Sequence, residues 1–204
     1  DGGEGGGLAR ARRSHQASRP PGPQHARRPR LEHAYLWTPA LMDHVAELGV
    51  VWNTQPAMLR VAGPGATIEA WGDRARYAFP FRSLHQRGVT ISSGSDWGVG
   101  PMAPLAALAT LATHRFAAAD GGAALNPDEA LTVPQALRVL TTGSARAGFL
   151  EGELGAIVPG LRADLVVLDR DLRTVDPRDL DAVAVDETWV DGRRVWSRED
   201  AGGG

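Results

Sequence analysis

Residues 89–97, VTISSGSDW, are the stretch from which we argue the fold. They predict a buried strand over 89–93 that runs into a tight turn at Gly94 and presents Ser95, Asp96 and Trp97. A carboxylate at the carboxyl end of a buried strand lies where barrels and open α/β folds place their chemistry. Its burial costs several kcal/mol unless it is paired or binds a metal. Alternatively, Asp96 caps the following turn or helix, and this residue alone leaves both readings open.

The residues upstream of this stretch predict a strand–helix–strand unit. A short strand is expected over 31–34 and another over 50–54. Between them, Thr38 is a good helix N-cap, Pro39 a good first helical residue, and Gly49 a stop. The apolar residues of the helix share one face at helical spacing: Leu41, Met42, Val45 and Leu48. Two strands joined by a helix through short loops predict a parallel crossover.

The remaining segments alternate between helical and extended patterns. Residues 55–78 form a long connection, which is typical of a binding loop, and are followed by a short helix over 81–88. An Ala/Leu helix is expected over 104–119, and a further helix begins at Thr132, is broken by Gly143 and ends at Gly148. Beyond it we expect an extended piece over 155–158, a buried strand over 165–168, and a hairpin of strands 183–190 and 193–197 around Asp191-Gly192.

Composition excludes several kinds of chemistry. The chain has no cysteine, and all 22 basic residues are arginine, so it contains no thiolate and no Schiff-base or carbamylated lysine. The net charge of −2 is uneven: residues 1–30 carry seven Arg against Asp1 and Glu4 (+5), and the remainder carries fifteen Arg against twenty-two acids (−7). We interpret residues 1–29 as a disordered tail and expect no nucleic-acid partner, since interleaved aromatics are missing. No apolar run suits a membrane span or signal peptide, so we expect a cytoplasmic protein.

Two residues with metal-ligand chemistry stand at predicted strand ends, His33 and Asp96. We expect them to end neighbouring strands of one sheet and to face a shared mouth. The histidines at positions 44, 85 and 114 are better explained as solvated or packed side chains, and those at 15 and 25 lie in the tail. No H-x-H, H-E-x-x-H or G-x-S-x-G motif occurs, and neither does a phosphate-binding glycine loop followed by lysine.

An ordered set of short motifs resembles a known family. It comprises RLEHA (30–34), LGV (48–50), QP (55–56), PFRSL (80–84), GV (88–89), GSDW (94–97), LT with AL (131–132, 136–137) and GAIVPGLRADLVVLD (155–169). The set is similar to the C-terminal part of metal-dependent amidohydrolases of family 3, the subgroup that includes N-substituted formamide deformylases. The resemblance covers about residues 30–197.

The resemblance implies an α/β fold, a (β/α)8 barrel that holds one or two divalent metals at its C-terminal mouth. By the same resemblance the metal is expected to be zinc. Residues 30–150 would be a partial barrel with strands six to eight, residues 151–198 the C-terminal share of a small β-sandwich, and residues 199–204 a disordered tail. His33 would be a metal ligand, Asp96 a metal ligand and catalytic base, and Trp97 a substrate contact.

The implied function is hydrolysis of a non-peptide carbon–nitrogen bond in a small amide or formamide substrate. The family's first-strand H-x-H, its fourth-strand bridging ligand and its fifth-strand His have no counterpart in this sequence. Two ligands are fewer than the roughly three protein ligands of a catalytic zinc. We therefore expect an incomplete C-terminal portion of an enzyme. The alternative is an inactive fragment, or one half of a split enzyme whose partner is the missing N-terminal half.

Overall fold

The computed structural model describes residues 28–62, 69–98, 102–116 and 123–201. The predicted disordered tail lies outside the described residues as far as residue 27, and so do His15 and His25. Within the described ranges, no helix combines the length and apolar character needed to cross a membrane.

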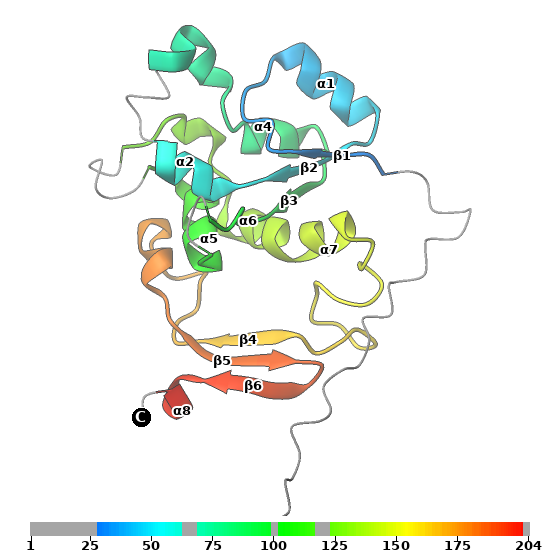
Figure 1. Ribbon diagram of the computed structural model, residues 1–204, viewed down its shortest axis with the longest axis vertical. Coiled ribbons are helices and arrows are strands. Elements are labelled where there is room, and N and C mark those ends of the chain that lie inside the picture. Colours follow the sequence, from blue (N-terminus) through cyan, green and yellow to red (C-terminus); the bar gives the residue numbers. More distant parts are fainter. Residues whose placement is uncertain (1–27, 63–68, 99–101, 117–122, 202–204) are drawn as a thin grey trace, which may run out of the picture.

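A three-stranded parallel sheet carries the N-terminal half of the described chain (Figure 1). Its strands are β1 (Arg30–Glu32), β2 (Val51–Thr54) and β3 (Ile91–Ser93), with β2 in the centre. The predicted parallel crossover is confirmed, but each strand is shorter than expected. β1 ends before His33 because His33 and Ala34 have φ angles of +61° and +45°, which take the backbone out of the extended region.

Helix α1 (Pro39–Glu47) begins as predicted, with the Thr38 hydroxyl accepting a hydrogen bond from the backbone N–H of Leu41. Gly49 follows it with a φ of +63°, a conformation that glycine adopts without strain. The predicted apolar face is only half correct. Met42 and Val45 are buried, whereas Leu41 and Leu48 are 42% and 58% exposed.

The long connection after β2 contains regular structure that its glycines and prolines obscured. It holds α2 (Pro56–Ala62) and a 3₁₀ helix, η1 (Gly72–Tyr77), while residues 63–68 lie outside the described residues. The short helix α4 (Phe81–Gln86) follows as predicted and leads into β3. Trp71 and Tyr77 pack partly buried against the core, so they contribute to packing here.

A helical layer follows β3 and separates the two sheets (Figure 1). It consists of α5 (Pro104–Thr113), α6 (Val133–Arg138), a π-helical turn η4 (Val139–Gly143) and α7 (Ser144–Ala147). Between α5 and α6 in the sequence, a 3₁₀ turn η3 (Pro127–Glu129) lies against α4, with the Glu129 carboxylate accepting from the Ser83 N–H and hydroxyl. The predicted break at Gly143 is wrong, since the helix continues through it to Gly148.

The outer edge of β3 is covered by this helix. The Ser144 hydroxyl accepts from the Ser93 N–H at 3.2 Å and lies 3.4 Å from the Ser93 carbonyl, while it donates to the Val139 carbonyl at 2.9 Å. At Gly143 the helix approaches so closely that an added Cβ would lie 2.1 Å from the Ile91 carbonyl oxygen. The outer edge of the three-stranded parallel sheet at β3 is therefore covered by this helix.

The C-terminal residues form an antiparallel sheet of β4 (Leu165–Leu168), β5 (Val185–Val190) and β6 (Arg193–Ser197). The predicted hairpin is confirmed, with positive φ at both Asp191 and Gly192. A 3₁₀ helix, η5 (Pro177–Ala182), precedes β5, and α8 (Arg198–Ala201) occupies the described part of the predicted tail. β4 was expected to be buried, but its Val166 and Val167 are 59% and 44% exposed. Residues 155–158 form no strand.

His114 belongs to the core, as its interpretation as a packed side chain predicted. It is fully buried, its Nε2–H donates to the Phe79 carbonyl at 2.9 Å, and its Nδ1 accepts from the Asn126 N–H at 3.2 Å. Both ring nitrogens are thus used by backbone groups of two other segments. Burial lowers the pKa of His114, and this effect outweighs the opposing hydrogen bond to Phe79 and the charge of Glu129.

We expect the stability of the chain to fall as the pH drops below about 6.5, because the unfolded His114 binds a proton there while the folded one does not. One such group gives a slope of up to about 1.4 kcal/mol per pH unit, and the loss ends at the folded-state pKa. Urea unfolding between pH 8 and pH 5 measures it. A His114→Asn variant should lose this pH dependence of stability, whereas His44→Gln, at an exposed histidine, should keep it. Equal slopes in all three proteins would contradict the assignment of the pH dependence to His114.

Candidate functional site

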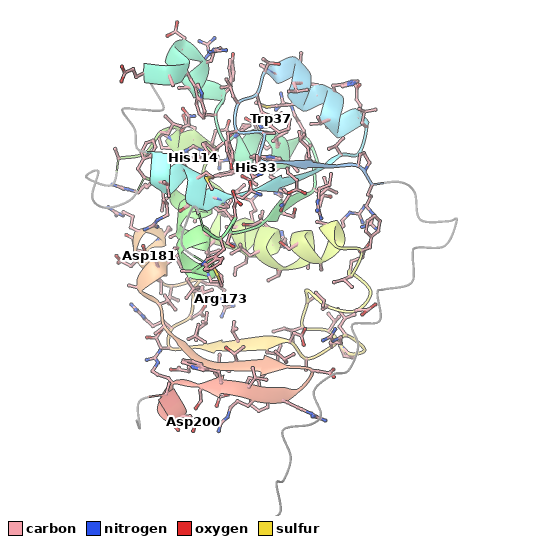
Figure 2. The ribbon with its side chains drawn as sticks, in the orientation of Figure 1. His33, Trp37, His114, Arg173, Asp181 and Asp200 are labelled. Atoms are coloured by element: carbon pink, nitrogen blue, oxygen red, sulfur yellow. The ribbon has the colours of Figure 1, made fainter. Side chains whose placement is uncertain are left out.

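His33 lies one residue beyond the carboxyl end of β1, beside the parallel sheet (Figure 2). Its side chain is exposed, and its backbone is held in place by two hydrogen bonds. The His33 N–H donates to the Asn53 carbonyl at 3.1 Å, and the buried Trp52 indole N–H donates to the His33 carbonyl at 2.7 Å. These contacts stabilise the left-handed conformation from which the imidazole projects.

Asp96 lies three residues beyond the carboxyl end of β3 and is also exposed. Its φ of +49° is a conformation that Asp tolerates better than most residues. The preceding turn is anchored because the Gly94 N–H donates to the Thr54 carbonyl at 3.0 Å. His33 and Asp96 were expected to end neighbouring strands, which is wrong: β2 lies between β1 and β3. The two residues therefore follow alternate strands at the same edge of the sheet, where strand axes are about 10 Å apart.

Tyr35 is the residue at this edge that sequence reasoning missed. Its hydroxyl lies 2.9 Å from His33 Nδ1 and donates to Oε1 of the buried Gln55 at 3.3 Å. Desolvation and, after it, the negative charge of Asp96 raise the pKa of Tyr35 to about 12. The phenol thus contacts His33 directly and lies within the electrostatic reach of Asp96. The only signal in the sequence was a hydroxyl-bearing aromatic two positions after His33.

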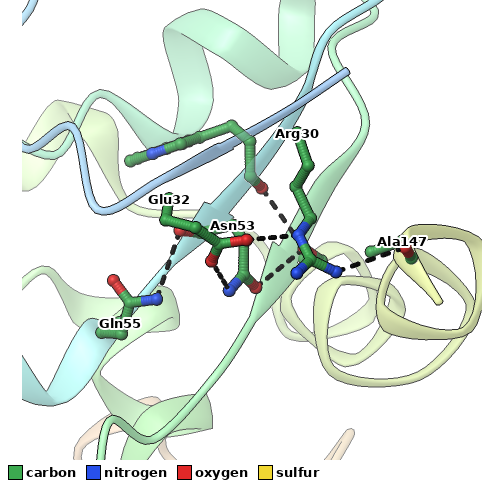
Figure 3. A network of polar contacts seen from close by, with 7 residues as sticks. Arg30, Glu32, Asn53, Gln55 and Ala147 are labelled. Atoms are coloured by element: carbon green, nitrogen blue, oxygen red, sulfur yellow. Dashed lines mark hydrogen bonds and ion pairs between the residues drawn. The ribbon is translucent and has the colours of Figure 1, made fainter. Parts of the chain in front are cut away.

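A row of polar side chains crosses the sheet just before the strand ends. Glu32, Asn53 and Ser92 are paired across β1, β2 and β3. Asn53 donates to the Glu32 carboxylate and accepts from the Ser92 hydroxyl at 2.9 Å, while Arg30 pairs with Glu32. Figure 3 shows these contacts continuing to Gln55 on one side and to the Ala147 carbonyl on the other. The row joins the three strands just before the segments that hold His33, Gln55 and Asp96.

A cavity of about 260 Å³ borders the turn after β3. Ser93, Gly94 and Ser95 line it together with Arg60 of α2 and Met102. Trp97, the predicted substrate contact, does not line this cavity and is 75% exposed. The cavity thus lies between α2, which belongs to the long connection predicted to be a binding loop, the turn after β3, and α5.

The described residues place His33 and Asp96 at the same edge of the sheet, after β1 and β3, with β2 between these strands. Among the described residues, no group of three or more His, Cys, Asp and Glu side chains is placed to hold a metal ion. An imidazole nitrogen and a carboxylate oxygen both suit zinc, so the donor chemistry fits, but the number of donors is below that of a catalytic zinc site.

Comparison with known proteins identifies the family. The sequence profile described as the amidohydrolase family matches residues 6–196. An N-substituted formamide deformylase of Arthrobacter pascens is 35% identical over 166 residues, which cover 80% of this chain and 30% of the relative. The chain belongs to the amidohydrolase family, and the predicted membership is confirmed. The profile begins 24 residues before residue 30, where the resemblance was expected to start.

Solved structures agree with this membership. An uncharacterized metal-dependent hydrolase from Pyrococcus horikoshii OT3 superposes with a TM-score of 0.60 at 25% identity, covering 72% of this chain and 30% of that protein. Atrazine chlorohydrolase TrzN from Arthrobacter aurescens TC1, complexed with zinc, superposes with a TM-score of 0.55 at 25% identity, covering 83% and 36%. The chain spans about a third of the length of the curated relatives that it matches.

Proposed function

We propose that this chain is the C-terminal portion of a metal-dependent hydrolase that cleaves non-peptide carbon–nitrogen bonds of amide or formamide substrates. β1, β2 and β3 would be strands six to eight of a (β/α)8 barrel, and β4 to β6 the C-terminal share of a β-sandwich. One observation carries the proposal: His33 and Asp96 are both exposed at the carboxyl edge of one parallel sheet. Tyr35 lies between them in its interactions, since its hydroxyl contacts His33 and the negative charge of Asp96 contributes to its raised pKa.

In this proposal His33 and Asp96 would hold a divalent metal, zinc by analogy with the family, together with ligands from the remainder of the complete protein. When bound, such a metal supplies a water of lowered pKa at neutral pH. Asp96 accepts the proton of the attacking water and returns it to the leaving amine, for which an exposed carboxylate beside the sheet edge is suited. The 260 Å³ cavity beside Ser95 would receive the substrate's apolar part, since Ala57, Met102 and Leu140 line it. A cytoplasmic location belongs to the same proposal.

Closing a barrel would place a further strand on the outer edge of β3, since all eight strands must pair in a ring. In this chain Ser144 and Gly143 already pack against that edge, through the hydrogen bond between Ser144 and Ser93 and the close approach of Gly143 to Ile91. We therefore propose that the helix from α6 to α7 moves outward when the remaining strands are present. This movement would open the close contact between Gly143 and the backbone of Ile91.

A second candidate is favoured by the donor count. Because no group of three or more His, Cys, Asp and Glu side chains among the described residues is placed to hold a metal, the chain by itself would be an inactive fragment, or one half of a split enzyme that needs a partner chain. The two candidates differ in what the chain does with zinc when it is alone and when strands one to five are supplied.

We expect the complete protein to bind zinc stoichiometrically and the 204-residue chain to bind it weakly. His33→Ala should lower the zinc affinity of the complete protein by more than about 100-fold, because losing a ligand costs more than losing an outer partner, which costs 10–100-fold. Equilibrium dialysis with metal analysis measures both. His44→Ala, at an exposed histidine on α1, is the matched control. Unchanged affinity in His33→Ala refutes the ligand role, and stoichiometric zinc on the chain alone refutes the incomplete ligand set.

A further inference from the structure

Three hydrogen bonds in series join the backbone of β2 to the His33 imidazole. The Gln55 side-chain Nε2 donates to the Asn53 carbonyl at 3.4 Å. The Tyr35 hydroxyl donates to Gln55 Oε1 at 3.3 Å, and the Tyr35 oxygen lies 2.9 Å from His33 Nδ1. The series begins at a carbonyl, a group that can only accept a hydrogen bond. This end therefore decides which group is the donor in each of the following hydrogen bonds.

The direction passes from one group to the next. Because the Gln55 amide nitrogen faces the Asn53 carbonyl, the amide oxygen faces Tyr35 and can only accept. The phenol proton is therefore used toward Gln55, and the phenol oxygen has only lone pairs to offer to His33. Nδ1 of His33 must then carry a proton to make the 2.9 Å contact. A neutral imidazole has one N–H, so Nε2 is left with its lone pair.

We propose that Tyr35 is a positioning residue that selects the Nδ1–H tautomer of His33 and leaves Nε2 as the atom that binds metal. The selection of the tautomer is a property of this chain's own residues. Its use for metal binding rests on the function proposed above. Metal-binding histidines commonly have their second nitrogen engaged in this way, which fixes the tautomer and the orientation of the ring.

The surroundings hold the phenol in place for this task. The Tyr35 ring stacks on the buried Phe79 with centroids 4.7 Å apart and an interplanar angle of 27°. The Phe79 N–H also donates to the Tyr35 carbonyl at 2.8 Å. Gln55 is only 3% exposed, so water has little access to its Oε1 atom, which accepts the Tyr35 proton. His33 is itself exposed, and the phenol is the only hydrogen-bond partner recorded for its ring among the described residues.

The test is a long-range ¹H–¹⁵N NMR spectrum of the 204-residue chain at about pH 8, where imidazoles are largely neutral. In the wild-type chain, His33 should show a protonated Nδ1 and an unprotonated Nε2. Tyr35→Phe removes the acceptor and should shift His33 to the Nε2–H tautomer that free imidazoles of histidine prefer in water. Gln55→Leu keeps the phenol but frees its proton to point at Nδ1, so the same inversion is expected. Tyr77→Phe, at the chain's other tyrosine, should change nothing.

The inference is overturned if His33 is Nε2–H in the wild-type chain, or if Tyr35→Phe leaves the Nδ1–H tautomer in place while thermal unfolding shows the variant folded. Because the spectrum is recorded without metal, these results are independent of the proposed function. In the complete protein, Tyr35→Phe should then weaken zinc binding about 10–100-fold relative to Tyr77→Phe. If the NMR spectra show the expected tautomers but Tyr35→Phe does not weaken zinc binding, Tyr35 still selects the tautomer of His33. The metal-binding role of Nε2 is then refuted.

Discussion

Replacing Asp96 by asparagine is expected to lower turnover of the complete protein by about 10²–10⁴-fold, the usual contribution of a positioned general base. Asparagine keeps the size of the side chain and one oxygen that can face a metal, but it cannot accept the proton. The substitution suits the backbone, since Asn tolerates the φ of +49° at this position at least as well as Asp. Turnover should therefore fall while the free energy of unfolding stays within about 0.5 kcal/mol, as for other exposed sites.

The measurement is kcat and kcat/KM on a formamide or amide substrate, with zinc content determined on the same samples. Asp191→Asn is a matched control, because Asp191 is also exposed and has a φ of +52°, but it lies in the hairpin turn between β5 and β6. Wild-type turnover by a zinc-loaded Asp96→Asn protein would refute the role of base. Loss of zinc together with turnover would instead support the ligand role, because the missing metal alone then accounts for the lost turnover.

Local patterns predicted the parallel sheet well because they depend on near neighbours in sequence. Thr38 and Pro39 begin α1, Gly49 ends the unit, and Asp191-Gly192 forms the hairpin, each through backbone preferences of single residues. Membership of the family was predictable for the same reason, since its motifs are short and follow one another in order. The burial of β4 was not predictable, because exposure of Val166 depends on what lies against the sheet and not on the strand itself.

The candidate site was predicted in part. His33 and Asp96 were found from their places after strands, but Tyr35 was not, because its contact with His33 requires the left-handed turn at His33 and Ala34. That turn is stabilised by the Trp52 indole, which lies 19 positions later in the sequence. The sequence analysis also expected His33 and Asp96 to follow neighbouring strands, whereas β2 lies between their strands in the sheet.

Gly143 shows how tertiary contact can reverse a local preference. In a helix interior, Gly→Ala ordinarily stabilises by about 1 kcal/mol. Here an added Cβ would lie 2.1 Å from the Ile91 carbonyl oxygen and 3.0 Å from the Arg138 carbonyl oxygen, and both are backbone atoms that cannot rotate away. We expect Gly143→Ala to destabilise the chain by about 3 kcal/mol, at the upper end of the usual cost of overpacking. The sign is thus opposite to that given by helix propensity.

Chemical denaturation of the 204-residue chain measures this effect, with Gly152→Ala as the control because nothing lies within 4 Å of a Cβ there. A neutral or stabilised Gly143→Ala chain would mean that the helix does not lie on the edge of β3, and the Ser144 contacts with Ser93 would fail with it. The same substitution in the complete protein separates the two arrangements of that edge. If the helix moves outward when a further strand pairs with β3, the cost should be much smaller there than in the chain alone. An equal cost in both would refute the outward movement and, with it, the proposed closure of a barrel at β3.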